Sequence, residues 1–247
     1  MISKAHTKYI QSLRHKKFRD ETGLFFAEGP RLVSDLLSSG KFACKEIFAL
    51  QQWVDDNAGM LATLQGTNIT TIENYELEKI SMLTTAHHVL AVFEKRKPDF
   101  DFDVAGKITL ALDQVQDPGN MGTIIRIADW FGIADIVCAT GTADIYNPKV
   151  VQGTMGSLGR VNIIYTDLPA WLGRNKNVKI FSASLHGKDV KAIGTLKEGI
   201  IIIGNEAAGV SGQVLSLVTE RITIPKIGAA ESLNAAVATG IILSHIR

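Results

Sequence analysis

Side chains that could bind and orient a substrate gather in three segments of the chain. The first holds Asn120 and Arg126, the second holds Glu206, and the third holds Ser232 and Asn234. Amides, a hydroxyl, a carboxylate and a guanidinium can form hydrogen bonds and ion pairs with a polar ligand and can orient it for a reaction. The His and Cys residues do not occur at the spacing of metal ligands, so we expect a reaction without a metal.

The pattern around Arg126 allows more than one interpretation. It follows a turn signal, Asp117-Pro118-Gly119-Asn120, and stands among isoleucines and an alanine in a helix predicted over 123–130. A guanidinium among apolar residues of a helix extends along the helix to solvent, pairs with an acidic side chain, or binds a ligand in a functional site. The spacing alone leaves these alternatives open.

Two glycines frame the second segment, GNEAAGVS. Gly204 and Gly209 permit backbone conformations that other residues avoid, and they would let a ligand approach the main chain. Glu206 lies between them, directly after an apolar stretch. An ordinary turn with a solvated carboxylate is the alternative interpretation.

The third segment, IPKIGAAESLNAAVATGIILSHI, ends in a predicted helix with an apolar face. Ser232 is expected to cap the first turn of that helix. For both Ser232 and Asn234, capping and a role in a site are compatible.

The elements around these segments must position them. After Gly106, apolar stretches predict strands over 108–112, 136–139, 161–165, 178–183, 200–203 and 221–224. Helices are expected over 123–130, ended by Gly132, and from Pro148 onward. This alternation predicts an α/β fold with a parallel sheet covered on both faces. Ligands of such sheets bind in loops at the carboxyl ends of the strands.

A charged segment divides the chain. Residues 95–106, KRKPDFDFDVAG, carry Pro98 and Gly106 and predict a linker. We place a first domain at 1–97, the linker at 98–106 and a second domain at 107–247. Strands expected over 24–27, 46–50, 69–72 and 89–93, with a helix over 31–37, make the first domain a small α/β unit.

Charge and composition limit the classes of partner. The chain is 46% hydrophobic with a net charge of +1, so it is globular and has no global field that attracts nucleic acid. Its amino-terminal arm is nevertheless basic. Six cations precede the first acid, Asp20: Lys4, Lys8, Arg14, Lys16, Lys17 and Arg19. They form either a solvated helix end or a set of phosphate contacts.

The remaining composition favours a cytoplasmic protein without a membrane partner. Cys44 and Cys138 do not make a disulfide framework, which is consistent with a reducing compartment. The start, MISKAHTKYI, lacks the apolar stretch of a signal peptide, and the longest apolar runs are too short to span a bilayer.

The segments resemble the three signature motifs of the SpoU, or TrmH-like, RNA 2′-O-ribose methyltransferases of the SPOUT superfamily. DPGNMGTIIR, IIIGNEAAGVS and IPKIGAAESLNAAVA match in order and spacing, as does NPKVVQGTMGSLGRV at 147–161. FFAEGPRLV and SMLTTAHHVLAVF are similar to the family's small RNA-binding domain of ribosomal-protein-L30-like (L30e-like) fold. The departures are Ala207 and Ala208, where glycine is common, and Gln152, where the family often has a basic residue.

The resemblance implies a parallel-sheet SPOUT domain with a C-terminal trefoil knot that binds S-adenosylmethionine. Patterns of elements alone would not predict a threaded chain. The cofactor contacts that carry over are backbone groups of Gly204, Ile224 and Leu233, with Asn205, Pro225 and Ala183 nearby. Glycine and apolar residues suit this role because they surround an adenine and leave main-chain groups free. Methyl transfer from a sulfonium needs no metal.

The same resemblance assigns roles to the polar residues. The family proposal has Arg126 activate the ribose hydroxyl. Since arginine stays protonated at neutral pH, we expect it to position the ribose and the adjacent phosphate instead. Glu206 is expected to hold Arg126 or Asn120, and Ser232 and Asn234 to orient the ribose or its phosphate. The group that accepts the proton stays open.

The implied partners are RNA and a second copy of the chain. The family's active site forms at a homodimer interface, and Arg14, Lys16, Lys17 and Arg19 are expected to contact RNA phosphates. Ribosomal RNA is favoured over transfer RNA, because a second domain gives a large folded target a second contact surface.

Three other functions are open to comparison. They are a transfer RNA 2′-O-methyltransferase, a non-catalytic RNA-binding protein of the same fold, and a nucleotide-binding dehydrogenase. The last is disfavoured, because Gly153, Gly156 and Gly159 have the wrong spacing for a dinucleotide loop and are expected inside a helix.

Overall fold

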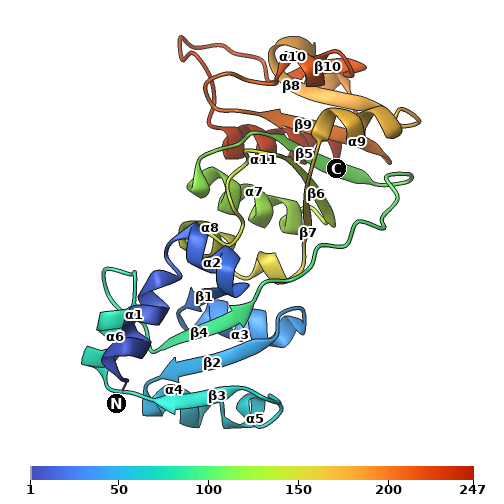
Figure 1. Ribbon diagram of the computed structural model, residues 1–247. Coiled ribbons are helices and arrows are strands. Elements are labelled where there is room, and N and C mark those ends of the chain that lie inside the picture. The colour runs from blue at the N-terminus through green and yellow to red at the C-terminus, as the bar shows by residue number, and fades with distance from the viewer. Residues whose placement is uncertain (1) are drawn as a thin grey trace. The chain divides into compact units, whose positions relative to one another are not determined.

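The computed structural model describes residues 2–247, and its contacts divide the chain into two units (Figure 1). The first unit comprises the chain up to Lys97 together with Asp144–Gly159. The second comprises Pro98–Ala143 and Arg160–Arg247. Each unit has its own sheet and its own apolar core.

The first unit is built on a mixed sheet of four strands in the order β1-β4-β2-β3. The strands are β1 (Leu24–Glu28), β2 (Cys44–Ala49), β3 (Asn68–Thr71) and β4 (Val89–Glu94). β4 pairs antiparallel with both β1 and β2, and β2 pairs parallel with β3. All four lie where apolar stretches predicted strands.

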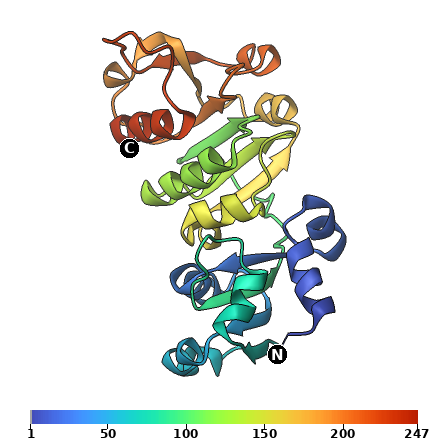
Figure 2. The same cartoon turned by 90° about the vertical axis from the view of Figure 1, so that its left-hand side faces the viewer.

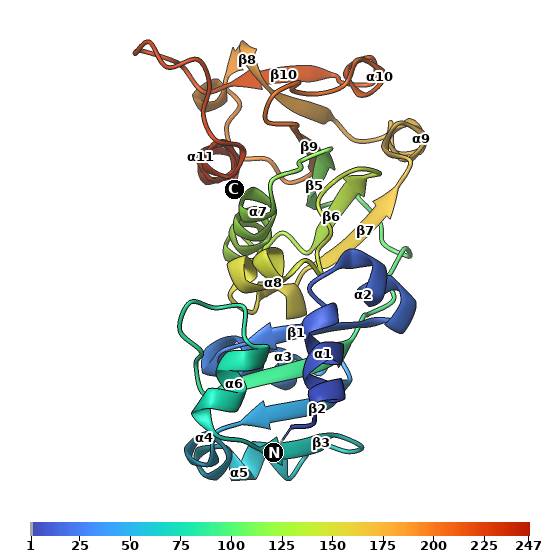
Figure 3. The same cartoon turned by 60° about the vertical axis from the view of Figure 1, so that its left-hand side comes forward.

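Helices of the first unit pack on this sheet. They are α1 (Lys4–Ser12), α2 (Lys16–Thr22), α3 (Pro30–Ser39), α4 (Gln51–Asp56), α5 (Ala58–Leu61) and α6 (Asn74–Ile80). Figure 3 shows α1 beside α6, and side chains of the two helices share one core with β1, β2 and β4. α3 buries Leu32, Val33, Leu36 and Leu37, the face expected from its periodicity.

The segment 144–159 packs in the first unit although its sequence neighbours belong to the second. It forms α8 (Pro148–Thr154) and a 3₁₀ turn, η1 (Ser157–Gly159). The Tyr146 ring lies 4.7 Å from the ring of Phe25, and its hydroxyl accepts a hydrogen bond from the Arg96 amide at 3.0 Å. α8 ends at Thr154, so the expectation of a helix through all three glycines is wrong. Met155 takes φ 49° and Gly156 takes φ 90°, which end it.

The second unit is an all-parallel sheet of six strands in the order β10-β8-β9-β5-β6-β7. The strands are β5 (Ile108–Asp113), β6 (Asp135–Ala139), β7 (Asn162–Thr166), β8 (Ile180–Asp189), β9 (Gly199–Gly204) and β10 (Glu220–Thr223). The predicted α/β fold with a parallel sheet is confirmed. The chain first adds β6 and β7 on one side of β5, and later adds β9, β8 and β10 on the other.

Helices of the second unit are α7 (Pro118–Trp130), α9 (Leu168–Arg174), α10 (Gly212–Leu215) and α11 (Ala235–Ile246), with a 3₁₀ turn, η2 (Val190–Ala192). Figure 2 shows the final helix α11, in red, beside the green helix α7. Among residues 2–247 no helix combines the length and hydropathy needed to cross a bilayer.

Two predicted helix starts need correction. α7 begins at Pro118, five residues before 123, because Asp117 caps it and proline suits the first helical position. α11 begins at Ala235, and its cap is Asn234 rather than Ser232: the Asn234 side chain accepts from the amides of Ala236 and Val237.

The segment 98–106 forms no helix or strand, yet it belongs to the second unit. Val104 is buried in that unit's core, and the Phe102 ring lies 6.3 Å from the ring of Trp171. The apolar side chains of the predicted linker therefore pack on the second unit.

Gly156→Ala should destabilise the first unit. The added Cβ would lie 2.5 Å from a carboxylate oxygen of Asp35, at φ 90°. We expect a loss of at least about 2 kcal/mol in the free energy of unfolding, measured by denaturant titration. Gly173→Ala in α9 is the control, since nothing lies within 4 Å of its added Cβ. Equal effects of the two substitutions would contradict the packing of segment 144–159.

Candidate active site

Two of the three predicted segments leave neighbouring strands at the same edge of the second unit's sheet. β5 ends at Asp113 and β9 ends at Gly204, and these two residues are paired in register. β5 lies where the order of strands changes direction, and ligands of open parallel sheets bind at such a point. Asp113 is buried and accepts from the Ser211 amide at 2.7 Å, which joins the two loops.

A chain of side-chain hydrogen bonds connects all three segments. Asn120, at the start of α7, donates to Glu206 at 2.8 Å. Asn234, at the start of α11, donates to the side-chain oxygen of Asn120 at 2.7 Å. Asn120 is only 7% exposed, so its amide oxygen and nitrogen both need partners. We call Glu206, Asn120 and Asn234 the polar junction.

Backbone amides fix the carboxylate of the junction. Glu206 accepts from the amides of Gln116 and Asp117, each at 3.3 Å. Burial raises the pKa of Glu206, but these hydrogen bonds, with those from Asn120 and from its own amide, outweigh burial and lower the pKa below its ordinary value. The carboxylate is therefore ionised at neutral pH and fully used in orienting its donors. The sequence analysis did not predict that the Gln116 amide binds Glu206. The only indication in the sequence was the helix cap, Asp117-Pro118, that follows Gln116.

The glycines of the second loop have different structural reasons. A Cβ on Gly204 would lie 2.4 Å from the carbonyl carbon of Gly209, because the loop folds back onto the end of β9. Gly209 takes φ 69°, in the left-handed region. The Asn205 side chain closes the loop: its oxygen accepts from the amides of Ala207 and Ala208, and its nitrogen donates to the Gln114 carbonyl. The side chain of Asn205 therefore holds the loop.

The residues expected to hold a cofactor fit an adenosine-bearing ligand. From 225 to 233 the main chain forms no hydrogen bond to another main-chain group within residues 2–247. Leu233 is about half exposed, Pro225 is exposed, and Ile227 is fully exposed. Ile224, which precedes Pro225 in the sequence, and Ala183, which lies in β8, are both half-buried. Free amides and carbonyls next to exposed apolar side chains are what an adenine and its ribose require.

Arg126 and Ser232 stand apart from the polar junction. Arg126 is exposed, and its guanidinium forms no hydrogen bond or ion pair with any residue from 2 to 247. It lies six residues beyond Asn120, about 9 Å along the helix. Glu206 therefore holds Asn120 and does not hold Arg126. Ser232 is exposed in the segment before α11, and its hydroxyl has no partner among the described residues.

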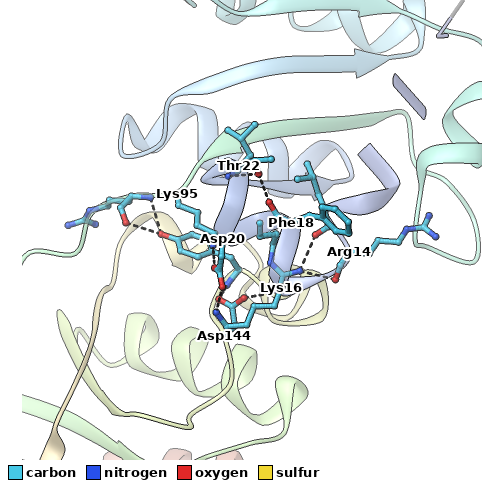
Figure 4. Close-up of polar contacts among 12 residues, drawn as sticks. Arg14, Lys16, Phe18, Asp20, Thr22, Lys95 and Asp144 are labelled. Carbon is cyan, nitrogen blue, oxygen red and sulfur yellow. Dashed lines mark hydrogen bonds and ion pairs between the residues drawn. The ribbon is translucent and has the colours of Figure 1, made fainter. Parts of the chain in front are cut away.

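The basic arm is divided between structural and exposed cations (Figure 4). Arg19 is 1% exposed, donates to the carbonyls of Leu13 and Arg14, and pairs with Asp144 at 2.7 Å. A guanidinium so enclosed cannot reach a phosphate, so the prediction that Arg19 contacts RNA is wrong. Arg14 is half-buried and donates to the carbonyls of Ile80 and Ser81 at the end of α6.

Lys16 and Lys17 are exposed cations of the arm, as are Lys4 and Lys8 on α1. Lys16 pairs with Asp20 at 2.5 Å, and Lys17 lies 3.8 Å from Glu21, both on the same helix. Exposed ion pairs of this kind are weak, so each lysine can leave its carboxylate and bind a phosphate instead.

Comparison with known proteins identifies the family to which the chain belongs. Its fold and site define an α/β protein with a six-stranded parallel sheet and a polar site at the carboxyl ends of neighbouring strands. The sequence pattern of the SpoU rRNA Methylase family matches residues 107–244, and that of the MRM3-like substrate binding domain matches residues 4–91. The chain belongs to the SpoU rRNA Methylase family, so the family prediction is confirmed.

Relatives match over nearly the whole chain. The 23S rRNA (guanosine(2553)-2′-O)-methyltransferase RlmP of Bacillus subtilis is 32% identical over 241 residues, 96% of this chain and 94% of that protein. The AdoMet-bound rRNA methyltransferase from Sinorhizobium meliloti is 32% identical with a TM-score of 0.87, over 98% of this chain and 95% of that one. The AdoMet complex of the SpoU methyltransferase AviRb from Streptomyces viridochromogenes is 26% identical with a TM-score of 0.86, over 98% and 96%.

Removal of the Arg19 guanidinium should destabilise the protein. Arg19→Ala leaves Asp144 without its cation and should lower the free energy of unfolding by about 3 kcal/mol. Lys17→Ala, on the same helix, should change it by less than about 0.5 kcal/mol. Denaturant titration of both variants provides the measurement. A loss no larger than that of Lys17→Ala would contradict the buried ion pair between Arg19 and Asp144.

The polar junction should make stability depend on pH in a defined direction. Glu206→Gln places an amide group against backbone N–H donors and should cost about 1 kcal/mol at pH 7. Because the pKa of Glu206 is lowered in the folded state, its contribution is present above the ordinary pKa of 4.5 and is lost as the pH falls through the lowered value.

The difference in unfolding free energy between wild type and Glu206→Gln should therefore disappear in acid. Glu231→Gln, at an exposed position nearby in sequence, should show no difference at either pH. A difference that persists well below pH 4.5 would contradict an ionised Glu206 in the junction.

Proposed function

We propose that the protein transfers a methyl group from S-adenosylmethionine to a ribose 2′-hydroxyl of ribosomal RNA. The observation that carries the proposal is the polar junction at the carboxyl ends of β5 and β9, built from the residues of the family motifs. Membership of the SpoU rRNA Methylase family supports it. Ribosomal RNA is preferred over transfer RNA because relatives that cover the full chain are named as 23S rRNA and rRNA methyltransferases.

The cofactor supplies an electrophilic methyl group on a positively charged sulfur. Main-chain groups of Gly204, Ile224 and Leu233 would hold it, with the exposed apolar side chains of the 224–233 segment against the adenine. In the transfer, the ribose oxygen forms a bond to the methyl carbon, the carbon–sulfur bond breaks, and the hydroxyl proton leaves to a base or water. The described residues contain no group of three or more His, Cys, Asp or Glu that could hold a metal ion.

The amides of the junction are suited to orienting the ribose. Glu206 holds one side of Asn120, and Asn120 holds Asn234, so neither amide can rotate without breaking a hydrogen bond. Each amide nitrogen retains a second hydrogen that can donate to a ribose or phosphate oxygen. Glu206 is a positioning residue, because its oxygens already accept from three donors beyond its own amide.

Arg126 is the group we assign to the ribose and its phosphate. An exposed arginine without a partner can form bidentate hydrogen bonds to phosphate. Its distance from Asn120 along α7 is explained if two copies of the chain share each site. We therefore propose a homodimer in which Arg126 acts with the junction of the partner subunit. Exposed apolar side chains on α7 and α11 support this: Trp130 is 84% exposed and Val237 is about half exposed.

We also propose the trefoil knot for the carboxyl-terminal part of the second unit. Support comes from β8, which pairs with β10 at Ser182 and again from Lys188, so the register between the two strands shifts opposite Arg221 and Ile222. Gly187 faces the Arg221 carbonyl, where an added Cβ would lie at 2.5 Å. A cytoplasmic location is proposed as well, since both cysteines are buried and free.

Lys16 and Lys17, with the small first domain, are proposed to bind the RNA backbone. That first domain, residues 1–97, is proposed to have the L30e-like fold, and residues 107–247 to form the methyltransferase domain. The match to the MRM3-like substrate binding domain over residues 4–91 supports this division.

The test is transfer of labelled methyl from S-adenosylmethionine to ribosomal and transfer RNA, purified separately from cells that lack the protein. Label should appear in ribosomal RNA as a ribose 2′-O-methyl group. Arg126→Ala should lower the rate at least ~100-fold while cofactor affinity is unchanged, because one oriented charged donor is lost.

Arg174→Ala, which removes an exposed arginine of α9 in the same unit, is the matched control and should retain full activity. Label in transfer RNA alone would show that transfer RNA, and not ribosomal RNA, is the substrate. Cofactor binding without label in either RNA would support the non-catalytic alternative.

A further inference from the structure

The first unit contains a cavity that the methyl-transfer site does not explain. It has a volume of about 440 Å³ and lies between the start of α3, the helix α4 and the residue before β4. The residues that bear on its chemistry are Arg31, Ser34, Gln52, Trp53, Asp56 and His88. Its size is at the lower end of the range for sites that bind one small organic group.

Most polar groups of this cavity lack partners within the protein. The side chains of Arg31, Ser34, Gln52, Asp56 and His88 form no hydrogen bond or ion pair with residues 2–247. Trp53 as a whole is only 4% exposed, and its indole N–H, which is not fully buried, has no partner in the described chain. A nearly buried tryptophan normally places its N–H on an acceptor. The cavity therefore offers an unmatched set of donors and acceptors beside the small exposed part of an indole.

The charges favour a phosphate at one side of the cavity. Arg31 is exposed at the first turn of α3, a helix of 10 residues whose start no side chain caps. The positive end of the helix and the guanidinium both attract an anion. On the other side, Asp56 accepts hydrogen bonds and Gln52 both accepts and donates, as the edge of a nucleobase requires. His88, held at φ 55°, also lines the cavity.

We propose that this cavity binds a single unstacked nucleotide of the RNA substrate, with its phosphate on Arg31 and its base against Trp53, Gln52 and Asp56. The proposal rests on RNA being the substrate, and it adds a second recognition site on the first unit. Proteins that read RNA take bases out of single-stranded loops, stack them on planar side chains and bond their edges. The exposed rim admits a nucleotide that is still part of a chain.

The test uses the full chain with Arg31→Ala and His88→Gly combined. Glycine accepts φ 55° without strain, so the second change removes the His88 side chain and keeps this backbone conformation accessible. Lys41→Ala is the control, because Lys41 is exposed just beyond the other end of the same helix and does not line the cavity. Thermal unfolding of each variant verifies that it is folded.

Binding of a fluorescein-labelled adenosine hexaribonucleotide is measured first, at several salt concentrations. The double variant should bind about tenfold more weakly or worse, and its salt slope should fall by about 1 with the loss of one phosphate contact. The control should match wild type. Equal binding by all three proteins, or equal loss in the control, overturns the proposal. Adenosine monophosphate that binds as tightly as the hexamer also overturns it, since the site would then serve a free nucleotide.

Methyl transfer separates this proposal from the proposed function. On ribosomal RNA, the double variant should raise KM for RNA about tenfold and leave kcat and cofactor affinity unchanged, whereas Arg126→Ala lowers kcat. An unchanged KM with a lowered kcat would overturn a binding role for the cavity. If wild type methylates no RNA but the double variant still binds the hexaribonucleotide more weakly than wild type, the nucleotide site in the cavity is supported and the proposed function is wrong.

Discussion

The need of one buried amide for two partners organises the active-site region. Asn120 starts α7 almost out of contact with water, and its side chain has both a donor and an acceptor to satisfy. Glu206, in the loop after β9, accepts a hydrogen bond from the Asn120 amide nitrogen. Asn234, in the segment after β10, donates a hydrogen bond to the Asn120 amide oxygen. Because these three residues come from positions up to 114 apart in the chain, the junction fixes the ends of three strands relative to one another.

The same junction shows how one residue serves structure and chemistry together. Asn234 caps α11 with its side-chain oxygen and bonds Asn120 with its nitrogen. Glu206 is kept ionised by amides that also define the turn into α7. A side chain that only capped its helix would tolerate any good capping residue. Here the amide is required, because it must accept on one side and donate on the other.

Cations of the chain are assigned to different tasks by burial. Arg19 and Arg14 bind carbonyls and a carboxylate of the first unit, and so they stabilise its fold. Arg126 and Arg31 are exposed and have no partner in the described chain. A basic stretch in a sequence does not distinguish these cases, since the partners of Arg19 and Arg14 lie up to 125 residues away. The cations available for RNA are fewer than the arm suggests.

The sequence by itself determined the kind of fold, the place of each strand along the chain except for the extension of β8 to Asp189, and the three polar segments of the site. Those features depend on local rules: apolar stretches form buried strands, and turn and capping residues follow them. It did not determine that Glu206 would hold Asn120 instead of Arg126, or that Arg19 would be buried. Nor did it show that residues 144–159 pack in the first unit, or that Asp117 starts α7 so early. Pairings between distant residues and the burial of long side chains depend on which surfaces meet, and only the tertiary structure decides that.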